Sequence, residues 1–377
     1  MLTPVRIIVC VTNDLSTDQR VHKVCMFLTN KGAHVMLVGR KLPGSLELDR
    51  PYKTRRLRLL FTKGPLFYGF FNLRLFFFLL FSKSDVIVSN DLDTLWACAK
   101  TKRLKKRTSL VYDMHEIFTE VPELAHSPIK KRIWERMERK NIKTASQHIT
   151  VNHSIAQWYT NKYGIPMEVV RNMPPRFTHD AHVPPADIES EKKYLIIQGA
   201  GINVDRGNEE LVRCLAFLPP QIQLLIIGNG DVIPYLRQLS IELNLQRRIT
   251  FFTKMPFEKL IRYTRSAWLG ITLDKNTNLN YTFSLPNKLF DFIQANCPVL
   301  ASDLPEVSAV VKKYNVGIIA RSHNPKELAE QIMELHTNIA LYAQLKQNTI
   351  KAASELCWEN EIPVLEKIYG PYLRAHL

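Results

Sequence analysis

The sequence is poor in cysteine, and its few cysteines lack the spacing of a redox or metal centre. The six are Cys10, Cys25, Cys98, Cys214, Cys297 and Cys357. No two form a CxxC pair, and no histidine cluster accompanies them, so we expect neither a disulfide framework nor a zinc site. The thiols fit a reducing cytosol. The N-terminus enters a strand-like run at once and shows no signal peptide, which favours a cytoplasmic chain.

Several ligand-binding motifs are also missing. Residues 224–230 have the sequence LLIIGNG, but the third glycine of a dinucleotide fingerprint does not follow, so a nicotinamide cofactor is not expected. No RNP, zinc-finger or helix-turn-helix signature is present, which argues against a nucleic-acid partner. Beyond Asp91 and Asp93 there is no pair resembling a DxD metal site. We therefore expect no metal and no cofactor.

The longest apolar run is shorter than a typical membrane span. Residues 65–81 (PLFYGFFNLRLFFFLLF) include Asn72 and Arg74. A spanning helix needs about 20 apolar residues, and a central arginine costs about 2.5–3.5 kcal/mol on insertion. We interpret the run as a helix that is buried in a core or lies at a membrane interface. A true span is the third alternative.

Positive charge is abundant, and it is concentrated in the first half. The formal net charge is +16; residues 1–180 hold 30 Lys and Arg against 15 Asp and Glu, whereas the remainder holds 21 against 20. This asymmetry indicates an anionic partner for the first half, either nucleic acid or an anionic membrane. The basic run 100–107 (KTKRLKKR) is a solvated helix end or a contact for phosphates and lipid headgroups.

Short apolar runs alternate with helical patterns along the whole chain. In the first half, strand-like runs occupy residues 6–11, 33–39, 85–89, 109–112, 148–151 and 169–171. In the second half they occupy residues 194–198, 224–227, 249–252, 268–273, 298–301 and 316–320. Among the helices between them, Ser16 with Gln19 forms a predicted capping box. Ile129, Ile133 and Met137 form a predicted apolar stripe after Ser127 and Pro128. The pattern predicts an α/β protein with two Rossmann-like domains.

A Pro-rich polar stretch separates the two alternating regions. We place the first domain at residues 1–180, a linker at 181–193, the second domain at 194–357 and a final helix at 358–377.

Two segments of the second domain are suited to an anionic ligand. The loop from Gly199 to Gly207 follows a strand and precedes a helix, so its N–H groups and the helix dipole favour phosphate, and Arg206 adds a fork of donors. In the turn 284–288 and the helix after it, Lys288 could neutralise a diphosphate. Asp291, three residues further on, could accept hydrogen bonds from ribose or sugar hydroxyls. The alternatives are a plain turn with a surface arginine and a helix with an exposed salt bridge.

The order of these segments resembles the donor domain of family-4 glycosyltransferases, which have the GT-B fold. That family has a strand–GxG–helix unit, a strand that ends near a Pro turn (here residues 252–256, FTKMP) and an acidic helix ahead of a PVIAS-like strand (here 298–302, PVLAS). The resemblance covers about residues 194–320. It makes Arg206 the basic contact of the donor diphosphate, Lys288 the lysine of a P-S-K-L-F-E variant, and Asp291 the second acid of the paired-glutamate motif.

The sequence departs from the family pattern in three ways. The second acid is Asp rather than Glu, and Tyr281 or Thr282 stands where the first acid belongs. The first loop lacks the frequent arginine directly after its glycine.

In the first domain, residues 12–20 replace a Gly-rich loop, and residues 89–93 and 112–116 follow strands and should face the cleft. The resemblance makes His115 the cleft histidine that meets the transferred sugar; a structural histidine is the alternative.

The resemblance implies two Rossmann-like domains facing each other across a cleft, with residues 358–377 returning to the first domain. It implies a retaining, metal-independent transferase. This enzyme would move a sugar from a nucleotide-diphosphate-sugar to a glycan or lipid-linked acceptor at the cytoplasmic membrane face, in polysaccharide, lipopolysaccharide or glycolipid synthesis. Basic side chains would stabilise the leaving group, and no covalent nucleophile is assigned. An anionic membrane surface is an expected partner. The alternatives are a UDP-sugar 2-epimerase of the same fold and a non-catalytic GT-B subunit.

The residues expected to act fall into three groups. The catalytic set is His115, Arg206, Lys288 and Asp291. The donor-binding set is Gly199, Gly201, Arg206, Gly207, Gly228, Asn229, Gly230, Lys254, Met255, Ser284, Leu285, Pro286, Asn287, Lys288 and Asp291. The acceptor-side set is Asp14, Asp18, Gln19, Arg20, Asn90, Asp91, Asp93, Glu116 and Asn172.

Overall fold

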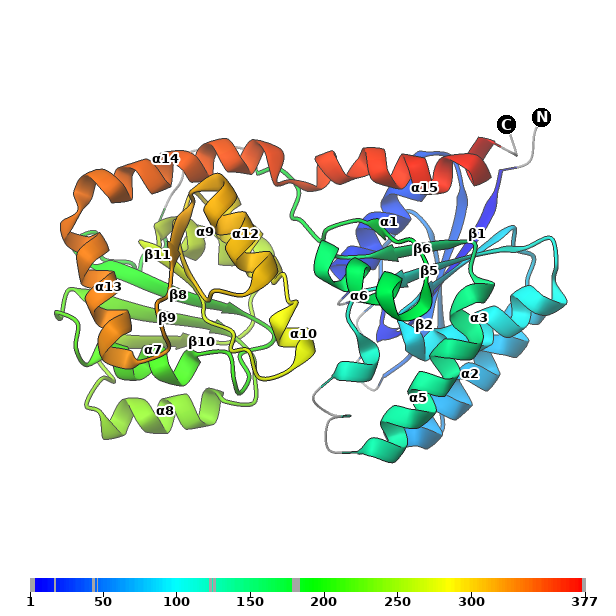
Figure 1. The fold of residues 1–377 in the computed structure, drawn as a ribbon, viewed down its shortest axis with the longest axis horizontal. Helices are drawn as coiled ribbons and strands as arrows, with labels where there is room; N and C mark the ends of the chain where they lie inside the picture. Colours follow the sequence, from blue (N-terminus) through cyan, green and yellow to red (C-terminus); the bar gives the residue numbers. More distant parts are fainter. Residues whose placement is uncertain are drawn as a thin grey trace. The chain divides into compact units, whose positions relative to one another are not determined.

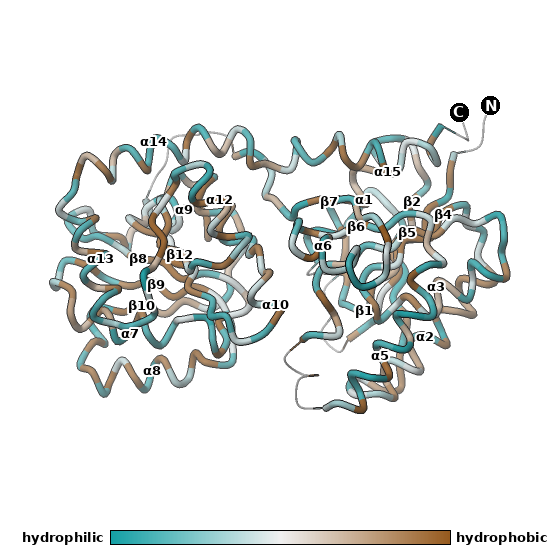
Figure 2. The backbone as a smooth tube through the Cα atoms, in the orientation of Figure 1, coloured by the Kyte–Doolittle hydropathy of each residue, from teal (hydrophilic) through white to brown (hydrophobic). Residues whose placement is uncertain are grey.

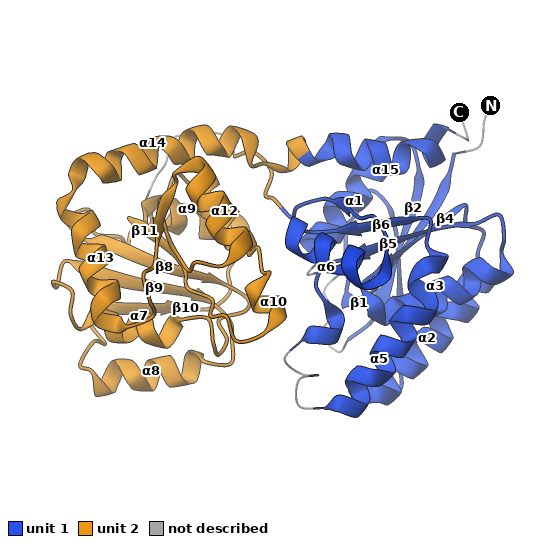
Figure 3. Ribbon diagram, in the orientation of Figure 1, with its two compact units in different colours: residues 1–172, 361–377 blue, residues 173–360 orange. Residues whose placement is uncertain are grey.

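The computed structural model describes residues 4–374 except 17, 43–44, 46, 122–123, 125–126 and 178–183. The chain divides into two compact units (Figure 3). Unit 1 comprises Met1–Asn172 and Glu361–Leu377, and unit 2 comprises Met173–Asn360. The sequence-based domain limits at residues 180 and 357 stay predictions beside this division.

Unit 1 is built on a parallel sheet with the strand order β3-β2-β1-β4-β5-β6-β7. Its described strands are β1 (Arg6–Asp14), β2 (His34–Arg40), β3 (Lys53–Leu57), β4 (Val86–Asn90), β5 (Ser109–Met114), β6 (Gln147–Thr150) and β7 (Glu168–Val169). In the central strand β1, Cys10 pairs with Val38 on one side and Ser89 on the other. Strands covered on both faces appear in a sequence as continuous apolar runs, which explains why the runs were recognisable.

Helices cover both faces of this sheet. They are α1 (Gln19–Asn30), α2 (Gly64–Phe81), α3 (Leu92–Leu104), α5 (Pro128–Asn141), α6 (His153–Tyr163) and α15 (Ile362–Arg374), with short 3-10 turns η1 (Phe118–Glu120) and η2 (Ile142–Thr144). Figure 1 shows α1 and α15 on one face and α2, α3 and α5 on the other. The alternation of strand and helix thus produces the predicted α/β fold.

Two local predictions in unit 1 are wrong. The cap of α1 is Asp18, whose Oδ1 accepts a hydrogen bond from the backbone N–H of Val21 at 3.1 Å, and not Ser16. The Ser16 hydroxyl donates to Asp14 instead, because the helix starts later than the capping-box pattern indicates. The apolar stripe of α5 is not core: the exposed fractions of Ile129 and Ile133 are 73% and 62%.

The apolar run 65–81 forms α2, which is half-buried. The residues that face α3 and the sheet are buried: Phe67, Phe71, Asn72, Leu75 and Leu79. The opposite side exposes Leu66, Leu73, Phe77 and Phe81, and Figure 2 shows pale to brown colour along the helix. By length and composition α2 could cross a membrane, and within the described residues no other helix could. One face of α2 is therefore part of the core, as the first alternative predicts, and contact of the exposed face with a membrane stays a prediction.

Unit 2 repeats the architecture with the strand order β10-β9-β8-β11-β12-β13. The described strands are β8 (Lys193–Gly199), β9 (Ile222–Gly228), β10 (Ile249–Phe252), β11 (Leu269–Thr272), β12 (Val299–Ala301) and β13 (Gly317–Ile319). The helices are α7 (Asn208–Leu215), α8 (Ile233–Glu242), α9 (Phe257–Ser266), α10 (Leu279–Thr282), α11 (Asn287–Gln294), α12 (Pro305–Tyr314), α13 (Pro325–Thr337) and α14 (Ile339–Glu355). One hydrophobic cluster joins the sheet to α7, α8 and α13, and a second joins it to α9, α11 and α12.

The C-terminal helix α15 belongs to unit 1, although it follows α14 of unit 2. Tyr369 of α15 packs against Phe27 of α1 with ring centroids 6.4 Å apart. Just before α15, Glu361 accepts hydrogen bonds from the backbone and the guanidinium of Arg171 at 2.8 and 2.9 Å. These contacts account for the return of the chain to the first domain.

Candidate functional site

Arg206 and Lys288 converge on one buried carboxylate in unit 2. Arg206 precedes α7, Lys288 lies in the first turn of α11, and Asp274 follows β11. The Arg206 guanidinium donates to Asp274 Oδ2 at 2.5 Å, and Lys288 Nζ lies 3.8 Å from Asp274 Oδ1. Asp274 is only 2% exposed. The two cations predicted from separate motifs are therefore neighbours, and the carboxylate between them was missed by sequence reasoning.

The cluster carries excess positive charge. The pKa of Lys288 is lowered from its usual value. Burial and the nearby Arg206 lower it, and Asp274 only partly offsets them. Two cations share one carboxylate, so an added anion would relieve their mutual repulsion. The Arg206 guanidinium also lies over the ring of Tyr281, with its Cζ 4.4 Å from the ring centroid. Tyr281, one of the two residues that could stand where the family pattern places its first acid, thus contacts the same arginine through its ring.

The glycine loops of β8 and β9 pack against each other. A Cβ on Gly230 would lie 1.8 Å from the carbonyl oxygen of Ile202, and one on Gly228 would lie 1.8 Å from that of Gly199. The backbone N–H of Asn229 donates to Gly199 O at 3.1 Å. Gly228 and Gly230 are therefore required by loop packing. Gly201, by contrast, has open space around its Cα, so ligand can approach the backbone there.

The remaining predicted donor residues lie around α11 and β10. Asp291 accepts a hydrogen bond from Gln198 Nε2 at 3.3 Å, which ties α11 to the end of β8. Leu285 and Pro286 lie directly ahead of α11, and Asn287 is its first residue. The buried Ser284 hydroxyl has no hydrogen-bond partner among the described residues. Lys254 and Met255 follow β10 at the edge of the sheet; Lys254 is exposed, and Met255 packs on the α11 cluster. Their donor role stays a prediction.

In unit 1, His115 belongs to a chain of charged groups at the carboxyl ends of β4 and β5. Its Nδ1 lies 3.3 Å from Asp91 Oδ2, and its Nε2 lies 3.6 Å from Asp113 Oδ2. Asp113 also forms a buried ion pair with Arg20 at 2.9 Å, and Arg20 donates to Val170 O at 2.6 Å. Asp113 was not predicted as a site residue, although it lies in the segment 112–116.

These neighbours set the charge of His115. Burial lowers its pKa, but Asp91 and Asp113 outweigh burial and raise the pKa to about 9. Burial likewise raises the pKa of Asp113, but Arg20 and His115 lower it well below its usual value. At neutral pH His115 is therefore an imidazolium held between two carboxyl groups. Such a group can donate a hydrogen bond to a bound hydroxyl.

Asp91 and Asp93 flank the start of α3 and differ in character. Asp91 has a positive φ of 56°, a strained conformation for a non-glycine residue, and its Oδ1 accepts the backbone N–H of His115 at 2.8 Å. Asp93 is buried and accepts a short hydrogen bond from the Thr12 hydroxyl. Burial and the charge of Asp91 raise the pKa of Asp93 to about 8. Asp93 is thus largely protonated at neutral pH.

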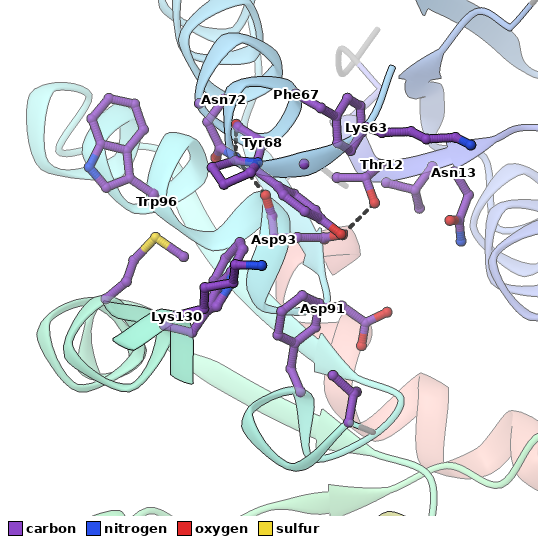
Figure 4. Close-up of a pocket in the computed structure, with 18 of the residues that line it drawn as sticks. Thr12, Asn13, Lys63, Phe67, Tyr68, Asn72, Asp91, Asp93, Trp96 and Lys130 are labelled. Carbon is purple, nitrogen blue, oxygen red and sulfur yellow. Dashed lines mark hydrogen bonds between the residues drawn. The ribbon is translucent and has the colours of Figure 1, made fainter. Parts of the chain in front are cut away.

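A cavity of about 890 Å³ opens beside these residues, between the ends of β1 and β4 and helices α2, α3 and α5 (Figure 4). Of the predicted acceptor-side residues, the ones that line it are Asp18, Asn90, Asp91, Asp93 and Glu116. Its wall is aromatic, a feature that sequence reasoning missed: the rings come from Phe67, Tyr68, Trp96, Phe118 and Trp134. The signal in the sequence is the aromatic run 65–81, which supplies Phe67 and Tyr68.

The other predicted acceptor-side residues do not line this cavity. Asp14 is bound by Ser16, Ser45 and Arg56, with the Arg56 contact at 3.2 Å. Asn172 accepts a hydrogen bond from Lys23 at 2.8 Å. Gln19 is exposed at the start of α1, and Arg20 is buried in its ion pair with Asp113. Their acceptor role stays a prediction.

Comparisons with known proteins bear on the family and the fold. The family described as Glycosyltransferase Family 4 matches residues 18–174, and Glycosyl transferases group 1 matches residues 183–352. The chain is 24% identical over 191 residues to a chitobiosyldiphosphodolichol beta-mannosyltransferase of Candida albicans; the match covers 48% of this chain and 41% of that protein. The matches to such curated relatives span between about a third and a little over half of their length.

Solved structures share the whole fold at low identity. Sucrose-phosphate synthase from Thermosynechococcus elongatus has a TM-score of 0.78 and 19% identity, with 98% of this chain and 100% of that chain covered. Anabaena HepE, solved in complex with UDP-glucose, has a TM-score of 0.72 and 15% identity, with 98% and 99% covered. Together the two family matches cover most of both units. The chain belongs to the GT-B glycosyltransferases of the family-4 type.

Proposed function

We propose that this protein transfers a sugar from a nucleoside-diphosphate-sugar to a lipid-linked acceptor at the cytoplasmic face of a membrane. One observation carries the donor half of the proposal: Arg206 and Lys288 lie against the same buried carboxylate, Asp274, beside the glycine loop of β8. A diphosphate is the ligand that two such cations beside a glycine loop suit best. The solved neighbour with bound UDP-glucose supports the same donor class.

The proposed mechanism is electrostatic. As the bond between the sugar and phosphate breaks, negative charge grows on the diphosphate, and Arg206 and Lys288 stabilise it. In this scheme the two side chains supply positive charge that a divalent metal would otherwise provide. His115, as an imidazolium, would donate a hydrogen bond to the transferred sugar. Retention of anomeric configuration is part of the proposal and follows the family.

The acceptor half of the proposal rests on unit 1. The curated relatives are named for transfer to a diphosphodolichol-linked sugar, which supports a lipid-linked acceptor. The excess of Lys and Arg in the first half and the exposed apolar face of α2 suit contact with an anionic membrane. We therefore propose peripheral attachment through this face.

A transfer assay tests the donor site. Purified protein would be incubated with UDP-, GDP- and dTDP-sugars and extracted lipid acceptor. Arg206→Ala and Lys288→Ala should each lower kcat/KM by about 10²–10³-fold, as the loss of one preorganised donor does elsewhere. Arg321→Ala and Lys312→Ala, which remove exposed ion pairs in the same unit, are matched controls and should remain active.

The assay also separates the alternatives. Release of a free epimerised sugar nucleotide without acceptor would favour a 2-epimerase, and no turnover of any donor would favour a non-catalytic subunit. Full activity of both Arg206→Ala and Lys288→Ala would contradict the proposed phosphate site.

Liposome sedimentation tests the membrane contact. The protein should sediment with anionic liposomes at low salt, and Phe77→Ser with Phe81→Ser should weaken this binding because both rings are exposed on α2. Phe217→Ser, an exposed phenylalanine of unit 2, is the matched control. Equal sedimentation with neutral liposomes would remove the electrostatic part of the proposal.

A further inference from the structure

The unit 1 cavity has a buried polar end. Asp93 is 7% exposed and Asn72 is 6% exposed, and both line the cavity together with Thr12. Asn72 Nδ2 donates to the backbone oxygen of Asp93 at 2.7 Å, and Figure 4 shows Thr12 and Asp93 directed toward one another. A mostly protonated carboxyl and a hydroxyl can each donate and accept hydrogen bonds, so this end suits a ligand rich in hydroxyl groups.

Another part of the cavity lining is a cluster of aromatic rings from three elements. Trp134 of α5 packs against Phe118 of η1 with centroids 4.8 Å apart and meets Tyr68 of α2 edge-on at 5.1 Å. The ring centroids of Phe67 and Tyr68, both on α2, lie 4.9 Å apart. Such a wall binds hydrocarbon by burying apolar area.

Two apolar side chains near the aromatic wall are exposed to solvent. Ile133 lines the cavity and is 62% exposed, and Leu66 at the start of α2 is 64% exposed. Exposed apolar side chains beside a cavity mark a surface that a partner can cover. A hydrocarbon chain that entered between α2 and α5 would cover it.

Basic side chains border this entrance. Lys63 precedes α2 and Lys130 lies in the first turn of α5; both are exposed and both line the cavity. Arg40 also lines it, with its guanidinium 4.8 Å from the centre of the Phe67 ring. The cavity therefore joins a hydroxyl-binding end, a set of cations and a hydrocarbon-binding wall.

We propose that this cavity binds the lipid carrier of the acceptor, a hydrocarbon chain joined through phosphate to a sugar. The hydrocarbon lies along Tyr68 and Trp134, the phosphate lies at Lys63 and Lys130, and the sugar points toward Asp93. The assignment of this ligand as an acceptor rests on the proposed function. Binding of the carrier does not require transfer, so it can be tested separately.

Intrinsic tryptophan fluorescence provides the test, because Trp96 and Trp134 line the cavity whereas Trp158, Trp268 and Trp358 do not. Farnesyl diphosphate would be added to the full chain without any nucleotide-sugar. It should change the emission with saturation, and Trp134→Phe should remove most of that change. Inorganic diphosphate and farnesol should each bind at least about tenfold more weakly, because each satisfies only one part of the site.

Charge variants separate the phosphate contact from the hydrocarbon contact. Lys63→Ala combined with Lys130→Ala should weaken farnesyl diphosphate by about tenfold or more and leave farnesol unchanged. Lys53→Ala, an exposed lysine on β3, is the control. The proposal is overturned if inorganic diphosphate binds as well as farnesyl diphosphate, or if the double variant binds farnesyl diphosphate normally. Binding without sugar transfer would retain this site while removing the proposed function.

Discussion

Asp274 gives the sharpest prediction about the donor site. Asp274→Asn keeps the size of the side chain but leaves Arg206 and Lys288 without their counter-charge. Breaking a buried ion pair costs about 3–5 kcal/mol. The side chains of Arg206 and Lys288 are 22% and 13% exposed, so some solvent reaches them, and we expect the lower end, about 3 kcal/mol. For a unit of this size that corresponds to a fall in Tm of about 6–12 °C.

A nucleoside diphosphate should compensate for the missing carboxylate. In the native protein Asp274 competes with a diphosphate for the same two cations, so Asp274→Asn should bind UDP more tightly. A ligand at 100 times its Kd adds about 2.7 kcal/mol of stability, and tighter binding adds more at the same concentration. Thermal unfolding with and without UDP measures this, with Asp303→Asn, which breaks the exposed pair with Lys312, as control. An equal UDP shift in variant and native protein would refute the reasoning.

Two further predictions concern stability. The pKa of His115 is raised to about 9 in the folded protein, so its contribution to stability is complete below the unfolded pKa near 6.5 and is lost as pH rises through 9. Urea unfolding should show the free energy of unfolding falling by roughly 1–3 kcal/mol over this range. His115→Gln should reduce this fall but not abolish it, because Asp93, whose pKa is raised to about 8, also loses its contribution as pH rises toward 8. Gly230→Ala should lower the free energy of unfolding by about 1–3 kcal/mol, because its Cβ would overlap Ile202 O. Gly201→Ala should be nearly neutral, because nothing lies within 4 Å of the added Cβ. Equal losses for the two variants in urea unfolding would contradict the packing argument.

The fold was predictable because its signal is local. Parallel strands buried on both faces appear as continuous apolar runs, and the run 224–227 lies within β9 (Ile222–Gly228), every residue of which is buried. Helix starts were less predictable. Ser16 and Asp18 are both good caps by residue type, and only the path of the chain after β1 decides that Asp18 meets the N–H of Val21.

The donor site was half-predictable for a similar reason. Arg206 and Lys288 each lie in a recognisable local context, a glycine loop and a Pro turn before a helix. Asp274 follows β11 with no motif around it, and its importance comes from the sheet, which brings the ends of β8 and β11 side by side. A residue whose role depends on a neighbouring strand leaves no local pattern in a single sequence.

The apolar run of α2 shows which residue in such a run carries information. Hydropathy could not distinguish its faces, because apolar residues occur all round the helix. The two polar residues do distinguish them. Asn72 is buried, donates to Asp93 O at 2.7 Å and accepts the N–H of Ala97 at 3.2 Å, so it fixes one face on α3. Arg74 is exposed and donates to Arg58 O at 2.6 Å, so it marks the opposite face. An uncharged amide within an apolar helix therefore indicated packing, and the charge indicated the surface left for a partner.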